Sequence, residues 1–203
     1  MAHTKILTIL ILVFIIGCSI KKEYNIDDIL NKFEELDKKY ETSWRKEKLN
    51  LINIKYDNIT LYLEDLNDLK IKQNKKNLVE LIDARILMLE AQKEFLLAQN
   101  IDPRPLIEIK FDTVNGSLVN LLNLTGLFCE NKENILKGIP HYQSSAEKSQ
   151  KVILLFDKIL EQSLEAQQKI GTGKNRIEFY DFPPGRIITS NKISKNIIIN
   201  FCK

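Results

Sequence analysis

The sequence contains no glycine and no proline between Cys18 and Asp102. These two residues are the strongest breakers of regular structure, and apolar residues recur across this stretch at steps of three and four. Such spacing is typical of long amphipathic helices that pack side by side. The chain is therefore expected to be mainly α, an elongated antiparallel helical bundle over residues 25–171.

Local signals divide the first part of this bundle. Asn25 can cap the start of a helix, and the apolar spacing that follows leaves open whether residues 25–70 form one helix or two. A polar run at 72–77 predicts a turn. Residues 78–98 are apolar on several sides, which predicts a helix in the middle of the bundle. Asp102 precedes a proline and should end that helix.

The second part of the chain has more breakers. A helix over about 118–137 is expected to end at Gly138-Ile139-Pro140, with His141-Tyr142 in the following loop. Ser144 and Glu147 have the spacing of a capping box and predict the next helix, which Gly171 should end. Residues 172–203 are rich in β-branched and aromatic residues, which predicts a small C-terminal β-hairpin or extended segment. A flexible tail is the alternative.

The amino terminus has the plan of a secretory signal peptide. Lys5 precedes about eleven mostly apolar residues, fewer than the roughly 18 to 20 that a membrane-spanning helix needs. The residues Ile15-Ile16-Gly17-Cys18 resemble the lipobox of prokaryotic lipoproteins. The resemblance implies a cleaved signal peptide (1–17), acylation of Cys18, a lipid-anchored tether (18–24) and a place on the extracytoplasmic face of the cell membrane. The alternative is an uncleaved signal anchor over 6–20.

Two further cysteines, Cys129 and Cys202, remain once Cys18 is acylated. Disulfides persist outside the cytoplasm, so these two are expected to pair. The bond would close a loop of about 73 residues and stabilise the fold by on the order of 4 kcal/mol in the chain-entropy model. The alternative is two independent thiols, with Cys129 buried.

Composition excludes several functional classes. The chain has 30 basic and 27 acidic residues, too balanced for the concentrated basic face of a nucleic-acid-binding protein. His3 lies in the signal peptide, so His141 is the only histidine of the mature chain. Zinc sites and histidine-dependent nucleophiles therefore lack their usual residues. We expect no metal, no cofactor, no nucleic acid and no catalytic residue.

Few residues suggest a site. Asp83 and Arg85 place charge on the apolar helix over 78–98 and are predicted to form an interhelical polar network; the alternative is a narrow solvent-exposed face. Asn115-Gly116-Ser117 matches the N-glycosylation pattern in a predicted loop.

These features favour a non-catalytic envelope scaffold or protein-interaction module. Its expected partners are the membrane, through acylated Cys18, and a protein of the cell envelope. The alternative is a surface module that binds a ligand or ion in an interhelical pocket near Arg85. An enzyme with paired carboxylates is a weaker hypothesis, because no spacing in the sequence selects a pair.

Overall fold

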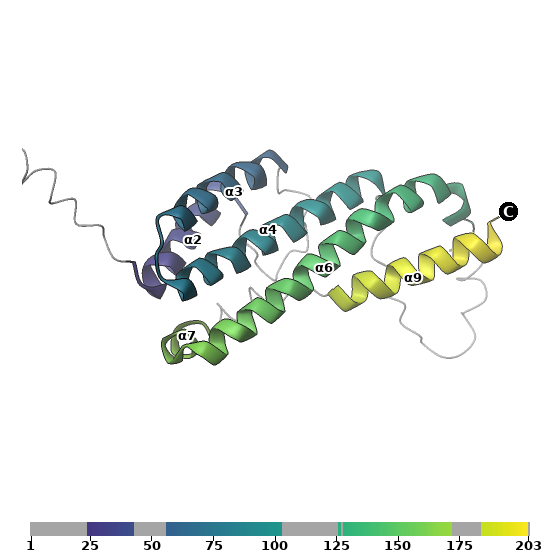
Figure 1. Cartoon of the computed structure of the whole chain (residues 1–203). Helices are drawn as coiled ribbons and strands as arrows, with labels where there is room; N and C mark the ends of the chain where they lie inside the picture. The colour runs from purple at the N-terminus through teal and green to yellow at the C-terminus, as the bar shows by residue number, and fades with distance from the viewer. Residues whose placement is uncertain (1–23, 43–55, 103–125, 127, 172–183, 203) are drawn as a thin grey trace, which may run out of the picture.

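A computed structural model of the chain describes residues 24–42, 56–102, 126, 128–171 and 184–202, which Figure 1 draws in colour. Helices supply the regular secondary structure of these ranges, and no strand occurs among them. The helices are α2 (Ile26–Tyr40), α3 (Tyr56–Ile71), α4 (Lys76–Ile101), α6 (Lys132–Gln162), α7 (Leu164–Ile170) and α9 (Pro184–Phe201). The predicted mainly α fold is therefore confirmed, and its long helices pack against one another (Figure 1).

Helix α2 begins at the cap that the sequence predicts. The Asn25 side-chain oxygen accepts a hydrogen bond from the Asp28 backbone N–H (2.9 Å), and the Asp28 carboxylate accepts one from the Asn25 backbone N–H (3.1 Å). The helix ends at Glu41, whose backbone is left-handed (φ 54°), a common way for a helix to stop. The residues from 25 to 70 therefore do not form one continuous helix.

Helices α2, α3 and α4 follow one another in antiparallel order. The Tyr62 hydroxyl of α3 donates to the Phe33 carbonyl of α2 (3.2 Å), and Lys93 Nζ of α4 donates to Thr60 Oγ1 of α3 (3.0 Å). The polar residues 72–75 separate α3 from α4, as predicted. Helix α4 packs against both α3 and α6 and is buried on several sides, which confirms its predicted place in the middle of the bundle.

Small residues bring α4 and α6 close together. Ala84, Ala91 and Ala98 recur every seven residues on α4, and all three are buried. Ser145 Oγ of α6 donates to the Ala91 carbonyl across the interface (2.7 Å). A Cβ atom added at Gly138 of α6 would lie 2.8 Å from Asp102 Cβ, nearer than such atoms approach. Because the side chains in this interface are small, the backbones of α4 and α6 approach closely. Their contact is the most extensive between any two helices of the described structure.

The predicted break at 138–140 is wrong, since α6 continues through it. Pro140 removes one backbone hydrogen bond, which costs roughly 3 kcal/mol in a helix interior. It lies on the exposed side, where water can bind the freed carbonyl. Its neighbours Ile139 and Tyr142 are buried, and Gly138 fits against α4. Packing therefore outweighs the local signal, so the predicted capping box at 144–147 also falls inside the helix.

The predicted β-hairpin or extended C-terminal segment is also wrong for residues 184–201, which form α9. Residues 172–183 lie outside the described part of the chain. Pro184 stands at the first position of the helix, where its fixed φ angle suits helix formation. Ile197 and Ile198 are buried by packing against α6. This burial overrides the weak preference of β-branched residues for strands.

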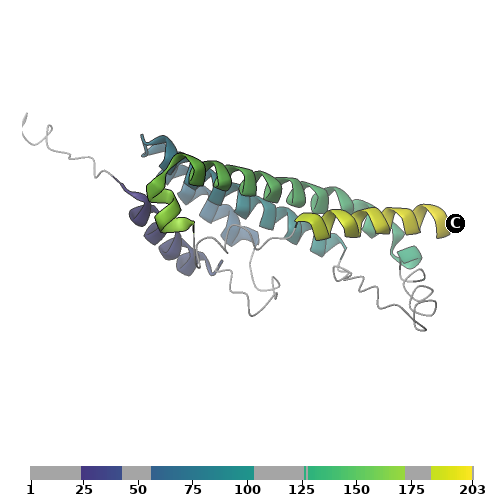
Figure 2. The ribbon, with the colours of Figure 1, turned by 90° about the horizontal axis from the view of Figure 1, so that it is seen from below.

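The buried apolar residues form two separate groups. The main core lies among α2, α3, α4, α7 and the middle and end of α6. The terminal core lies between α9 and the start of α6 together with the residues just before it, and consists of Phe128, Ile135, Ile139, Ile197 and Ile198. Figures 1 and 2 show α2 and α3 toward one end of the elongated molecule and the end of α9 at the other.

Candidate functional site

The most unusual polar group of the main core is the side chain of Arg85. It projects from α4, is only 1% exposed, and heads the largest fully buried side chains of the described residues. Its Nη2 donates to both carboxylate oxygens of Asp37 on α2, at 2.5 Å each. A buried arginine requires such a partner, because an uncompensated charge in the interior is very costly.

Residues from three helices complete what we call the Arg85 cluster. Arg85 Nε donates to the Tyr62 hydroxyl of α3 (3.4 Å), and Nη1 approaches the Met88 sulfur (3.8 Å). The guanidinium carbon lies 5.5 Å from the Phe33 ring centre and 5.8 Å from that of Tyr62, within cation–π range. The Arg85 cluster therefore fastens α2, α3 and α4 at one point.

The electrostatics of the Arg85 cluster favour a structural role. Burial raises the pKa of the Tyr62 hydroxyl well above its ordinary value, although the nearby Arg85 charge acts in the opposite direction. Tyr62 consequently stays protonated and keeps its donor for the Phe33 carbonyl. A neutral phenol and a compensated ion pair therefore bind the three helices together.

The sequence predicts only part of this arrangement. Asp83 does not join Arg85: it lies near the surface, 2.6 Å from Lys70 Nζ. Residues two apart on a helix do not face each other, which is why these two separate. The sequence does not single out Asp37, although it stands four residues after buried Phe33 and so lies beside the apolar stripe of α2.

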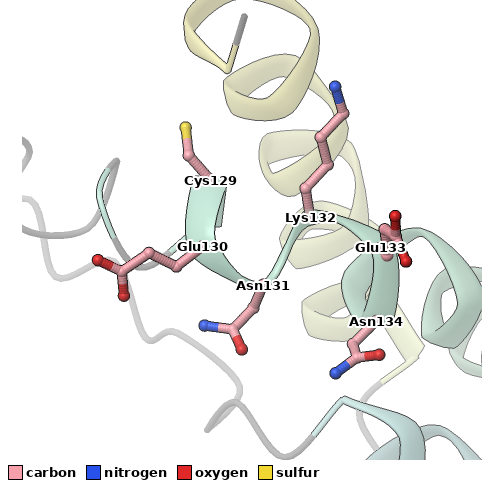
Figure 3. A pocket seen from close by; sticks show the side chains of 6 residues that line it. All are labelled: Cys129, Glu130, Asn131, Lys132, Glu133 and Asn134. Atoms are coloured by element: carbon pink, nitrogen blue, oxygen red, sulfur yellow. The ribbon is translucent and has the colours of Figure 1, made fainter.

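The ligand-binding alternative requires a pocket near Arg85. Protein groups surround the Arg85 guanidinium on several sides. Two hollows on the described surface are lined by other residues and do not include Arg85. One, of about 440 Å³, lies between α2 and α3 and includes Lys32 and Asp68. The other, of about 370 Å³, is lined by residues 129–134. Its side chains point in different directions and do not converge on one point (Figure 3).

A second polar cluster joins α4 to α6. His141 Nδ1 lies 2.8 Å from Glu94 Oε2, and Lys148 Nζ lies 3.4 Å from Glu94 and 3.7 Å from Glu90. Burial raises the pKa of the Glu94 carboxyl, but its hydrogen bond with His141 and the charge of Lys148 outweigh burial and lower it overall. His141 therefore belongs to an interhelical ion network, and its predicted place in a loop is wrong.

The structure joins Cys129 and Cys202 in a disulfide, with their Cα atoms 5.1 Å apart. The bond ties the end of α9 to the residues that precede α6, and Lys132 Nζ donates to the Cys202 carbonyl beside it (3.5 Å). The predicted lipidation site Cys18 and the predicted glycosylation site Asn115 both lie outside the described residues.

No group of three or more His, Cys, Asp or Glu residues in the described ranges is placed to bind a metal ion. No helix among them has both the length and the apolar character needed to cross a membrane. Comparison with protein-family models, with curated proteins and with solved structures gave no match.

Proposed function

We propose that the chain is an exported, lipid-anchored helical module that binds a protein of the cell envelope and catalyses no reaction. The observation that carries the proposal is the elongated bundle with two distinct ends (Figure 1). The proposed tether ends at Tyr24, just before α2, which lies toward one end of the bundle, and α9 ends at the other. A chain anchored through Cys18 would present α9 away from the membrane.

A diacylated Cys18 would be sufficient by itself to hold the chain at a membrane. Two acyl chains retain a protein stably at a membrane, whereas one gives marginal binding. Lys21 and Lys22 add weak attraction to anionic headgroups. The tether is short, so the α2 end of the bundle would lie next to the lipid surface.

The proposed absence of catalysis follows from how the polar groups are used. Arg85, Asp37 and Tyr62 bind one another inside the main core. Glu94 and His141 are joined by a hydrogen bond between two helices. The ligand-binding alternative gains no support around Arg85, because protein groups occupy the directions in which a ligand would bind.

Fractionation of cells tests the anchor. Wild-type chain should remain with membranes after a high-salt wash and incorporate labelled palmitate. Cys18→Ser should lose the label and keep residues 1–17, while the control Ser19→Ala should behave as wild type. Wild-type chain that takes up no label and keeps residues 1–17 would contradict the lipid anchor and favour the uncleaved signal anchor.

Native electrophoresis of gently solubilised membranes tests the interaction. The chain should migrate in a complex larger than 23.6 kDa, the mass of the whole sequence. The same chain purified alone should migrate as a monomer, which distinguishes a partner from self-association. A monomer in both samples would contradict the proposed interaction module.

A further inference from the structure

Helix α9 differs in charge from the rest of the chain. Its 18 residues include Arg186, Lys192 and Lys195 but no aspartate or glutamate. The whole chain is nearly balanced, with 30 basic and 27 acidic residues. Helix α9 is therefore a cationic element within an otherwise balanced protein.

Helix α9 also exposes large apolar side chains. Ile188 is 41% exposed, Ile199 75% and Phe201 63%. Its packed face includes polar Asn191 and Ser194, and Asn191 Nδ2 donates to the Ile139 carbonyl of α6 (3.4 Å). Helix α9 therefore packs a partly polar face against α6 and exposes isoleucines on another face. This exposed face is suited to contact with another protein.

The exposed residues follow a regular order. Ile188, Lys192, Lys195 and Ile199 are spaced by four, three and four residues, so they lie along one face of the helix. All four are exposed, and α9 itself contains no carboxylate side chain that could neutralise the two lysines. We call these four residues the outer stripe of α9.

We propose that the outer stripe of α9 binds an acidic amphipathic helix of a partner protein, an inference that rests on the proposed role as an interaction module. The spacing of the stripe is that of a helix–helix seam. A complementary helix places carboxylates opposite Lys192 and Lys195 and apolar side chains opposite Ile188 and Ile199. The charges supply specificity and the isoleucines supply buried area.

The order of residues argues against a second copy of this chain. The stripe reads apolar, basic, basic, apolar in both directions. Two such stripes therefore bring lysine against lysine whether the helices run parallel or antiparallel, and like charges in an interface are repulsive.

The same order argues against a lipid surface as the main ligand. A helix that lies in a membrane interface buries a continuous apolar face and keeps its cations at the edge of that face. Here the lysines occupy the middle of the stripe and the isoleucines its ends. Carboxylates of a protein partner fit this arrangement better.

The way in which α9 is fixed to the rest of the protein favours binding of a partner helix. The Cys129–Cys202 disulfide fixes its last turn, and the terminal core fixes the face opposite the stripe. The stripe is therefore preorganised, which reduces the entropy lost when a partner binds.

A designed peptide tests the stripe in the full-length chain, purified in a neutral detergent. The probe is a synthetic helix matched to the 18 residues of α9, with Leu-Glu-Glu-Leu at the spacing of the stripe. Fluorescence anisotropy should show saturable binding that weakens as salt is added. Lys192→Glu/Lys195→Glu should weaken binding by about 10-fold or more and should instead bind the matching Leu-Lys-Lys-Leu peptide.

A matched variant controls for net charge. Lys38→Glu/Lys151→Glu changes two exposed lysines on α2 and α6, and it should bind the acidic peptide within about 2-fold of wild type. Circular dichroism and a thiol assay should show that both double variants keep their helices and their disulfide.

Three results would overturn the inference. These are equal binding of the two peptides by wild type, tighter binding to phosphatidylglycerol-containing vesicles than to the acidic peptide, and self-association of the purified chain through α9. Peptide binding requires neither export nor acylation of Cys18. Its failure therefore removes the α9 inference alone, whereas fractionation and native electrophoresis test the proposed function separately.

Discussion

The main core and the terminal core are stabilised in different ways. The main core joins several helices and encloses a charged arginine with its partner. The terminal core joins α9 to the start of α6 through five buried residues, and a disulfide closes its end. A large apolar core can tolerate a buried ion pair that fixes the register of its helices, whereas a two-helix core is too small to be stable alone and benefits from a covalent link.

The largest expected effect comes from removing the partner of Arg85. Asp37→Asn keeps the shape of the side chain but leaves a guanidinium charge uncompensated inside the main core. We expect the free energy of unfolding to fall by about 3–5 kcal/mol, measured by denaturant titration. Asp68→Asn, an exposed change on α3, should have little effect.

A double variant sharpens this test. Asp37→Leu with Arg85→Met removes both charges, so it should recover most of the stability lost by Asp37→Asn.

The single variant also has a contradicting outcome. If Asp37→Asn lowers the free energy of unfolding by less than about 1 kcal/mol, the Arg85 cluster is not a buried ion pair of the kind described.

Opening the disulfide tests the terminal core. Cys129→Ser/Cys202→Ser should lower the free energy of unfolding by about 4 kcal/mol, since a loop of 73 residues is no longer closed. Hydrogen exchange should become faster in α9, while α2, α3 and α4 stay protected. Reductant should produce the same change in wild type and none in the variant. Equal loss of protection in α2 would show that the two cores unfold as one unit.

The sequence predicts the main core better than the terminal core. The reason is the distance along the sequence over which the deciding interactions act. The α2 cap at Asn25 and the stop at Asp102 depend on neighbours within a few residues. Pro140 and the isoleucines of α9 also give local signals, but packing against distant helices overrides them. Local chemistry therefore predicts a boundary only where no long-range contact competes with it.

The Arg85 cluster shows the same limit. A charged residue on an apolar helix indicates that a partner exists, and a polar network is predicted on that basis. The partner, Asp37, is 48 residues away in the sequence. Its identity depends on the antiparallel register of α2 and α3 and of α3 and α4, which no local pattern specifies. The disulfide was predictable for a different reason: once Cys18 is assigned to lipid, only one pairing remains.

A smaller and opposite effect is expected at Gln92, also in α4. Its side chain is fully buried, and neither its amide nitrogen nor its oxygen has a hydrogen-bond partner among the described residues. Gln92→Leu should therefore raise the free energy of unfolding by about 1–2 kcal/mol. The exposed change Gln150→Leu should leave it unchanged. Destabilisation by Gln92→Leu would mean that the amide is satisfied.

The smallest effect concerns the ion network between α4 and α6. The pKa of Glu94 is lowered in the folded chain from its ordinary value of 4.5, so its contribution to stability is present above that value and is lost as the pH falls through the folded pKa. Because Glu94 is only partly buried and its partners reach solvent, the contribution should be less than about 1 kcal/mol. Glu94→Gln should therefore be slightly less stable than wild type at neutral pH and equally stable near about pH 3. Denaturant titration at both pH values measures the difference, and a gap that persists in acid would assign it to packing of the side chain and not to its charge.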